Sequence, residues 1–172
     1  MRELTDKVVV ITGAAGGIGG ALVERFCLEQ AKVVACDINA DGLSALAGDI
    51  NEAHGIDIVQ EVLDITDKSA VDEFTQRTNT SVGQIGALIN NAGWDTPVQF
   101  LDSEPETWDK LIAINLYGPL NLQHAIVPTM VAAGGGKVVN ISSDAGRVGS
   151  SGEAVYSAVS YTHLTLPTIN WV

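Results

Sequence analysis

Residues 7–19 read KVVVITGAAGGIG, and this stretch decides the fold. Its β-branched apolar part, residues 8–11, is typical of a strand buried on both faces of a parallel sheet. Gly13 follows the end of this strand, and Gly16, Gly17 and Gly19 open an amphipathic stretch over residues 18–30. Glycines let a pyrophosphate approach the backbone closely, and free N–H groups at a helix N-terminus bind it. The stretch therefore predicts a strand, a phosphate-binding turn and a helix, with a plain glycine-rich connection as the alternative.

The composition is ordinary for one soluble globular domain, with 46% hydrophobic and 17% charged residues in a chain of 172. The 9 Lys and Arg residues are scattered and opposed by 21 Asp and Glu residues, which gives a net charge of −12. Nucleic acid is not an expected partner, because phosphate neutralisation needs clustered basic residues. No apolar run is long enough to span a membrane, and the N-terminus lacks the apolar segment of a signal peptide, so we expect a cytoplasmic protein without a membrane partner.

The two cysteines are expected to be buried thiols and not parts of a disulfide framework. Cys27 falls on the apolar face of the first predicted helix, and Cys36 falls in a predicted central strand. Neither belongs to a CxxC pair, and the sequence predicts no metal site.

The rest of the chain alternates between predicted strands and helices. Apolar runs predict further strands over residues 32–36, 56–63, 85–90 and 136–142. The segments between them predict helices over residues 40–54 and 67–82 and a long helix from about residue 103. This alternation predicts a doubly wound parallel α/β sheet, with a ligand at the carboxyl ends of the strands. Several polar residues are predicted at those ends: Asp37, Asp64, Asn91 and Ser143.

Asp37 ends the second strand roughly 20 residues after the glycine turn, where an acid that binds the adenosine ribose is expected. Its carboxylate would accept hydrogen bonds from the ribose hydroxyls and repel a 2′-phosphate. The position therefore favours NAD over NADP, with a solvated strand-end acid as the alternative.

The long predicted helix contains an unusual polar position. Ser103 and Glu106 have the spacing of a capping box, and Pro105 suits the first helical turn. Asn115 falls among apolar positions, where an amide without a partner is costly. Pro119 lies four residues later and has no N–H for the Asn115 carbonyl. We interpret the position as a polar site inside the helix, with a plain kink as the alternative.

These motifs together resemble the short-chain dehydrogenase/reductase family over residues 4–158. Residues 12–19 match its TGxxxGIG turn, and residues 90–93 match its NNAG motif. Three of its four catalytic positions are matched by Asn115, Ser143 and Tyr156. The resemblance implies an NAD-binding Rossmann domain over residues 1–158 that is incomplete and lacks the last strands of the family.

The resemblance also implies roles for these residues. Tyr156 would take the hydroxyl proton of an alcohol while a hydride passes to the nicotinamide, Ser143 would hold the substrate oxygen, and Asn115 would hold a relay water. The implied cofactor contacts are Gly13, Gly16, Gly17, Ile18, Gly19, Asp37, Asp64, Ile65, Asn91, Ala92 and Gly93.

The loops predicted to line the substrate are similar to those of family members that act on cyclic hydroxyacyl-CoA thioesters. They read NNAGWD (90–95), EPETWDKLIAINL (104–116) and SDAGRVGSSGEAVY (143–156). The resemblance implies a small-molecule or acyl-CoA substrate whose secondary alcohol becomes a ketone, and a homotetramer for the intact enzyme. Trp94 and Arg147 are candidate substrate contacts, although Arg147 is equally suited to bonding loop carbonyls. The alternatives are an NADPH-dependent 3-oxoacyl carrier-protein reductase, which Asp37 disfavours, and a nucleotide-binding protein without catalysis.

The chain departs from the family pattern at Ser160, where the YxxxK motif has the lysine that lowers the tyrosine pKa. Residues 159–172 read VSYTHLTLPTINWV, which is rich in β-branched residues and shows no helical period. Residues 159–168 also resemble the translation of a sequencing-library adapter. We interpret the tail as non-native, with a divergent natural C-terminus as the alternative. The chain is accordingly expected to be nearly inactive, with an exposed apolar edge on its fifth strand.

Overall fold

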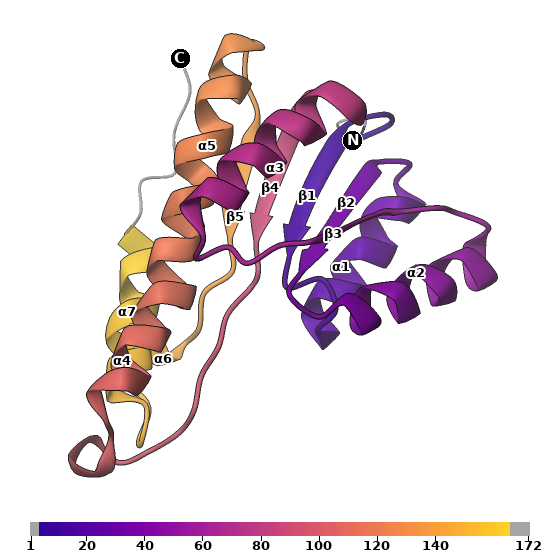
Figure 1. Ribbon diagram of the computed structural model, residues 1–172. Coiled ribbons are helices and arrows are strands. Elements are labelled where there is room, and N and C mark those ends of the chain that lie inside the picture. Colours follow the sequence, from indigo (N-terminus) through magenta and orange to yellow (C-terminus); the bar gives the residue numbers. More distant parts are fainter. Residues whose placement is uncertain (1–3, 166–172) are drawn as a thin grey trace.

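The computed structural model describes residues 4–165. Its centre is a five-stranded parallel sheet with the strand order β3-β2-β1-β4-β5 (Figure 1). The strands are β1 Val8–Thr12, β2 Lys32–Asp37, β3 Val59–Val62, β4 Ile85–Asn90 and β5 Lys137–Asn140. From β1 the chain runs outward to β3, then returns to β4 on the other side of β1. The predicted doubly wound α/β fold is therefore confirmed.

Helices cover both faces of the sheet, with α1 and α2 on one face and α3 and α5 on the other (Figure 1). The helices are α1 Gly17–Leu28, α2 Ala40–His54, α3 Lys68–Ser81, α4 Pro105–Ile112, α5 Gly118–Ala132, α6 Ala145–Val148 and α7 Ala154–Thr165. A 3₁₀ turn, Phe100–Asp102, precedes α4, and a π-helical turn, Ala113–Tyr117, joins α4 to α5.

The apolar run of β1 is buried along its whole length because it contacts both helical layers. Val10 packs into a cluster with Phe74 of α3 and Leu122 of α5, and Ile11 packs into a cluster with Val23 of α1. Alternate residues of a strand point to opposite faces, so an unbroken apolar run suits a strand with a core on each side.

The two outer strands are shorter than predicted. β3 occupies only Val59–Val62 of the predicted 56–63, and β5 occupies only Lys137–Asn140 of the predicted 136–142. Each pairs with one neighbour, β3 with β2 and β5 with β4. With a single partner strand and partial exposure, their ends lack the support that holds the three inner strands. Val139 is 44% exposed on β5, as expected for an apolar edge.

The predicted capping box at the start of α4 is wrong. Glu104 is the N-cap residue and makes no side-chain capping bond. Ser103 Oγ instead donates to the Phe100 carbonyl (2.7 Å) and accepts from Trp108 Nε1 (2.8 Å). The preceding 3₁₀ turn and the indole therefore use the hydroxyl that the capping box would need. Pro105 does begin the helix, as predicted.

Helix α7 continues past Ala158 to Thr165, so the absence of a helix beyond Ala158 was a wrong prediction for residues 159–165. Val159 and Ser160 are buried, and α7 packs against α4 and α6. A Cβ at Gly146 of α6 would lie 2.6 Å from the Tyr161 nitrogen, which shows how closely the two helices approach. Such packing outweighs the weak helix propensity of β-branched residues. Residues 166–172 lie outside the described part, and the non-native origin of the tail stays a prediction.

Both cysteines are free and buried, as predicted, and burial raises the pKa of each thiol. Within residues 4–165, no group of His, Cys, Asp and Glu side chains is arranged to hold a metal ion. None of the helices in this part of the chain combines the length and apolar character needed to cross a membrane.

Candidate functional site

The glycine turn between β1 and α1 leaves open space where the helix begins. Gly13 has φ of +64°, and a Cβ there would lie 2.8 Å from the Ala92 Cα. A Cβ at Gly19 would overlap the Gly13 carbonyl oxygen, whereas a Cβ at Gly17 would meet no atom within 4 Å. Gly16, the N-cap residue, supplies no side-chain cap, and the first turn of α1 holds no acid. The helix N-terminus therefore offers uncapped N–H groups beside empty space, which is what a dinucleotide phosphate requires.

Asp37 at the end of β2 is held against this turn by the backbone. Its Oδ2 accepts from the Ala15 N–H and its Oδ1 from the Asn39 N–H, both at 3.0 Å. The carboxylate lines a cavity of about 450 Å³, a size typical of small-molecule sites. Among the predicted cofactor contacts, this cavity is lined by Gly13, Asp37, Asp64, Ile65, Ala92 and Gly93.

Asp64, the acid that follows β3 at the carboxyl edge of the sheet, forms hydrogen bonds within its own loop. Its Oδ1 accepts from the N–H (2.9 Å) and the hydroxyl (2.7 Å) of Thr66. The neighbouring Ile65 is buried and contributes an apolar wall to the same cavity. The pair can therefore offer a base-sized ligand one polar group and one apolar surface.

Asn91 joins β4 to β1 where the strand order reverses. Its Nδ2 donates to the carbonyls of Thr12 (2.9 Å) and Gly13 (3.2 Å). In return, Thr12 Oγ1 accepts from the N–H groups of Asn91 and Ala92, each at 3.1 Å. These bonds fix the glycine turn relative to the loop after β4. Asn91 therefore has a positioning role at the point where these two segments meet.

The second cavity, of about 410 Å³, brings together the three candidate catalytic side chains, Asn115, Ser143 and Tyr156. It adjoins the first, because Ala92, Gly93 and Trp94 line both. Ile18 and Asn91 also line it. Apart from Gly16, Gly17 and Gly19, which line neither cavity, the predicted cofactor and catalytic residues therefore line two neighbouring cavities at the carboxyl edge of the sheet.

Asn115 lies in the π-helical turn and is bonded to the backbone of Trp94. Its Oδ1 accepts from the Trp94 N–H (2.9 Å), and its Nδ2 donates to the Trp94 carbonyl (2.7 Å). The predicted polar site inside the helix is therefore present, and its buried amide is satisfied. In this arrangement the side chain positions Trp94, and the relay-water role stays a prediction.

The loop after β5 and the start of α7 supply the other side of this cavity. Ser143 Oγ accepts from the Ala145 N–H (3.1 Å) at the start of α6, and Tyr156 is half-buried in the first turn of α7. Ser160 lies one turn further along α7, is 2% exposed and lines the cavity with Tyr156. The Ser142 hydroxyl donates to the Ser160 carbonyl (3.0 Å), which ties the loop to the helix.

Arg147 lies apart from this arrangement. Its guanidinium is exposed and pairs with the Asp144 carboxylate at 3.3 Å, and it lines neither cavity. Among the described residues, the basic side chain that lines the 450 Å³ cavity is instead Lys110, whose Nζ lies 4.0 Å from the centre of the Trp94 ring. Sequence reasoning missed Lys110, although it is four residues before Ile114 on the same helical face, and Ile114 lines that cavity too.

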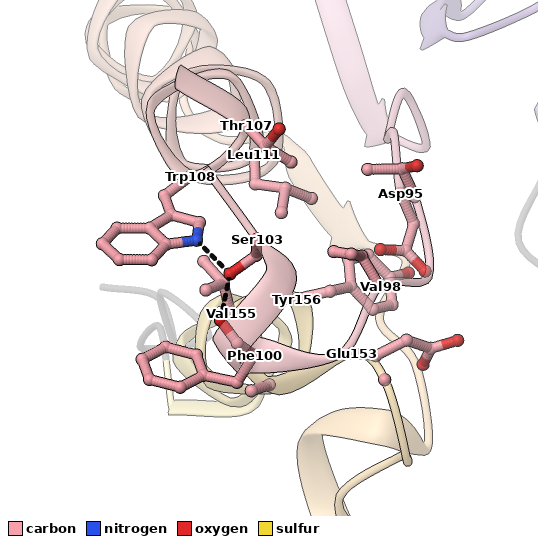
Figure 2. Close-up of a pocket in the computed structure, with 13 residues that line it drawn as sticks. Asp95, Val98, Phe100, Ser103, Thr107, Trp108, Leu111, Glu153, Val155 and Tyr156 are labelled. Atoms are coloured by element: carbon pink, nitrogen blue, oxygen red, sulfur yellow. Dashed lines mark hydrogen bonds between the residues drawn. The ribbon is translucent and has the colours of Figure 1, made fainter. Parts of the chain in front are cut away.

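Two further acids were also missed, and they lie at one end of a small cleft behind Tyr156. Figure 2 shows Asp95 and Glu153 at this end and the Ser103–Trp108 hydrogen bond at the other. Burial raises the pKa of the Asp95 carboxyl, the Thr96 N–H lowers it, and the neighbouring Glu153 raises it further. The two acids are 58 residues apart in the chain, so no local pattern in the sequence could pair them.

The sequence of residues 7–160 matches the family model described as short chain dehydrogenase. The FabG 3-oxoacyl acyl-carrier-protein reductase of Thermotoga maritima is 36% identical over 158 residues, which are 91% of this chain and 63% of that protein. A sorbitol dehydrogenase of Cereibacter sphaeroides is 35% identical over 165 residues, which are 95% of this chain and 63% of that protein. The chain thus spans 63% of the length of each of these relatives.

Solved structures show the same fold. An NAD⁺-bound xylitol dehydrogenase matches with a TM-score of 0.90 and 26% identity, covering 96% of this chain and 64% of that one. A levodione reductase matches with a TM-score of 0.90 and 29% identity, covering 95% of this chain and 64% of that one.

Proposed function

The chain belongs to the short-chain dehydrogenase family, and from this premise we propose that it is part of an NAD-dependent oxidoreductase that converts a secondary alcohol to a ketone. The observation that carries the proposal is the shared wall of the two cavities. Ala92, Gly93 and Trp94 line both a cavity that contains Asp37 and one that contains Ser143 and Tyr156. A cofactor in the first cavity and an alcohol in the second would therefore lie next to each other.

NAD is the proposed cofactor because the fixed Asp37 carboxylate would bind ribose hydroxyls and repel a 2′-phosphate. The open space at Gly17 and the uncapped N-terminus of α1 suit its pyrophosphate. The similarity to an NAD⁺-bound xylitol dehydrogenase supports the same choice. Bound NAD would supply the hydride acceptor for the reaction.

The chain's own residues would manage the proton of the alcohol. Tyr156 would accept the hydroxyl proton, and Ser143, whose oxygen already accepts from a backbone N–H, would donate its own hydrogen to the substrate oxygen. A phenol is a weak base at neutral pH unless a nearby positive charge favours its ionised form. Ser160 brings no positive charge to the cavity, so we propose that this chain turns over slowly.

The proposed substrate is 2-hydroxycyclohexanecarboxyl-CoA or a similar hydroxyacyl-CoA. The loops that carry this proposal contribute Trp94, Asp95, Ser143 and Tyr156 to the lining of the catalytic cavity. A second candidate, 3-oxoacyl carrier-protein reduction, is favoured by the 36% identity to a FabG protein. A nucleotide-binding protein without catalysis is favoured by Ser160 alone.

The test compares two reactant pairs, each assayed with the 172-residue chain. We expect it to reduce NAD with 2-hydroxycyclohexanecarboxyl-CoA and to oxidise NADPH with a 3-oxoacyl carrier protein poorly, as followed by nicotinamide absorbance. The reverse preference would establish the reductase alternative. Tight NAD binding with no turnover of either pair would establish a binding protein.

A further inference from the structure

The loop after β4 and the loop before α7 are joined beside the catalytic cavity. The Val98 N–H donates to the Gly152 carbonyl at 2.7 Å, where Gly152 has φ of +79°. On the first loop, Asn115 holds both backbone polar groups of Trp94, the residue before Asp95. Asp95 and Glu153 therefore line the same end of one cleft, on two loops that a backbone hydrogen bond joins.

Asp95 has an oxygen without a hydrogen-bond partner at this place. Its Oδ1 is buried, and no residue of the described chain donates to it. The side chain lines both the cleft that contains Glu153 and the 410 Å³ cavity that contains Ser143 and Tyr156. A buried carboxyl oxygen without a partner is costly, unless a ligand in the cavity supplies one.

Two adjacent carboxyl groups cannot both be ionised at low cost. Burial raises the pKa of Asp95, and the negative charge of Glu153 acts in the same direction. The two carboxyl groups therefore place negative charge at this end of the cleft, and Asp95 also lines the cavity that contains Tyr156. Such a pair repels a third carboxylate, whereas a neutral acyl carbonyl adds no like charge to the site.

Nothing else in the described lining of this cavity would neutralise an anionic ligand. The lining residues of residues 4–165 include no Lys, Arg or His. Arg147, the cation predicted to face it, pairs with Asp144 outside the cavity. A ligand carboxylate placed near Tyr156 would therefore meet negative charge without compensation.

We propose that Asp95 and Glu153 form a carboxyl pair that makes the catalytic cavity select a neutral acyl group over a free carboxylate. In a 2-hydroxycyclohexanecarboxyl thioester, the acyl carbonyl is attached to the ring carbon next to the reacting carbon, so it would lie close to Tyr156 and within the part of the cavity that Asp95 lines. The inference rests on the proposed function and adds to it a reason for a substrate whose acyl group is an uncharged thioester.

The test uses the 172-residue chain, saturating NAD and two ligands that differ in one charge. The ligands are methyl 2-hydroxycyclohexanecarboxylate, which is neutral, and 2-hydroxycyclohexanecarboxylate, which is anionic. Titration calorimetry at neutral pH measures the dissociation constant of each. We expect the ester to bind at least about tenfold more tightly than the acid, because juxtaposed like charges are strongly unfavourable at a partly desolvated site.

The double variant Asp95→Asn, Glu153→Gln keeps the side-chain shapes and removes the charge. We expect its ester-to-acid ratio to fall to about twofold or less through tighter binding of the acid. The matched control is Asp102→Asn, which removes an exposed acid of the same loop and should leave the ratio unchanged. If the double variant loses NAD binding, the single variant Asp95→Asn replaces it under the same criterion.

Three outcomes separate the inference from the proposed function. A wild-type ratio near one, or a ratio that persists in the variant, would overturn the carboxyl pair and leave the proposed substrate class intact. A fall in the ratio that Asp102→Asn reproduces would overturn it too, since bulk charge would then explain the preference. Binding of NAD without binding of either ligand would contradict the proposed substrate class and the inference together.

Discussion

The proposed cofactor side, around Asp37, and the proposed catalytic side, around Tyr156, differ in how their residues are held; they are called the cofactor side and the catalytic side below. On the cofactor side, the Asp37 and Asn91 side chains bond to the backbone of the glycine turn, and β1 is buried on both faces. On the catalytic side, Ser143 follows the edge strand β5, and Tyr156 lies in the first turn of α7. This helix continues beyond Ala158 into the segment that departs from the family pattern. The first side is supported by the sheet core, and the second by helix packing at its border.

This difference predicts that binding and catalysis can be separated by mutation. The residues proposed to bind the ribose and pyrophosphate of NAD, Asp37 and the glycine turn, follow the inner strands β2 and β1. The proposed proton transfer would instead depend on Tyr156 and on the residue one turn later, Ser160. Changes at position 160 should therefore alter turnover and leave cofactor affinity unchanged.

The largest expected effect comes from Ser160→Lys. Ser160 lines the 410 Å³ cavity beside Tyr156, so a longer side chain has room to extend there. A cation near the phenol stabilises its ionised form, and restored base catalysis is worth about 10²- to 10⁴-fold in rate. We expect NAD-dependent oxidation of the proposed substrate to rise by at least about 10²-fold, as measured by steady-state turnover.

The control for this variant is Ser160→Met, which has similar length and no charge. It should leave turnover near the level of Ser160. Equal gains from Lys and Met would show that filling the cavity, and not charge, limits the rate. No gain from Lys in a protein that still binds NAD would contradict the role given to position 160.

An effect of intermediate size is expected for two glycines of the turn, of which one should matter for stability and the other for NAD binding. A Cβ at Gly19 would overlap the Gly13 carbonyl oxygen and lie 2.8 Å from the Ala14 Cα, so Gly19→Ala should destabilise the protein by about 1–3 kcal/mol. Gly17→Ala meets no protein atom and should leave the Tm unchanged or slightly raised. It should nevertheless weaken NAD binding by about tenfold or more, since the methyl group would occupy the space proposed for the cofactor phosphate.

Thermal unfolding and NAD titration of the two variants check this contrast. A Gly17→Ala protein with unchanged NAD affinity would show that the space above the turn is not a phosphate site. A Gly19→Ala protein with an unchanged Tm would show that the turn can shift to accept a methyl group.

The smallest effect concerns Asp95→Asn and its dependence on pH. Burial raises the pKa of Asp95 above 3.8, so its ionised form lowers the free energy of unfolding at neutral pH. Well below pH 3.8 the carboxyl is protonated in both the folded and the unfolded state, so Asp95 no longer lowers the free energy of unfolding. Asp95→Asn should therefore raise the Tm slightly at pH 7, and the gain should shrink as the pH falls toward 4. A gain that grows at acidic pH would contradict the sign of the shift.

Much of the cofactor side could be predicted from the sequence because its signals are local. The apolar run of β1, the glycine turn and Asp37 at a strand end each depend on residues close together in the chain. The helix Ala40–His54 begins and ends where its pattern predicts, with the Asn39 side chain capping it and Gly55 ending it in the left-handed conformation.

The catalytic side was harder to predict because its contacts join distant segments. Ser103 forms a bond with Trp108 in place of the predicted cap, and α7 is stabilised past Ala158 by its packing on α6. The meeting of Asp95 with Glu153 depends on two loops joined by one backbone hydrogen bond. Composition and periodicity contain no information on such pairings.

The most direct measurement is calorimetric titration of the 172-residue chain with NAD and with NADP, beside its Ser160→Lys variant. We predict that both proteins bind NAD with the same affinity, and that both bind NADP at least about tenfold more weakly because of Asp37. This result would place cofactor selection entirely in the inner strands and their turns. Equal affinity for NAD and NADP, or NAD binding that appears only with lysine at position 160, would contradict the account.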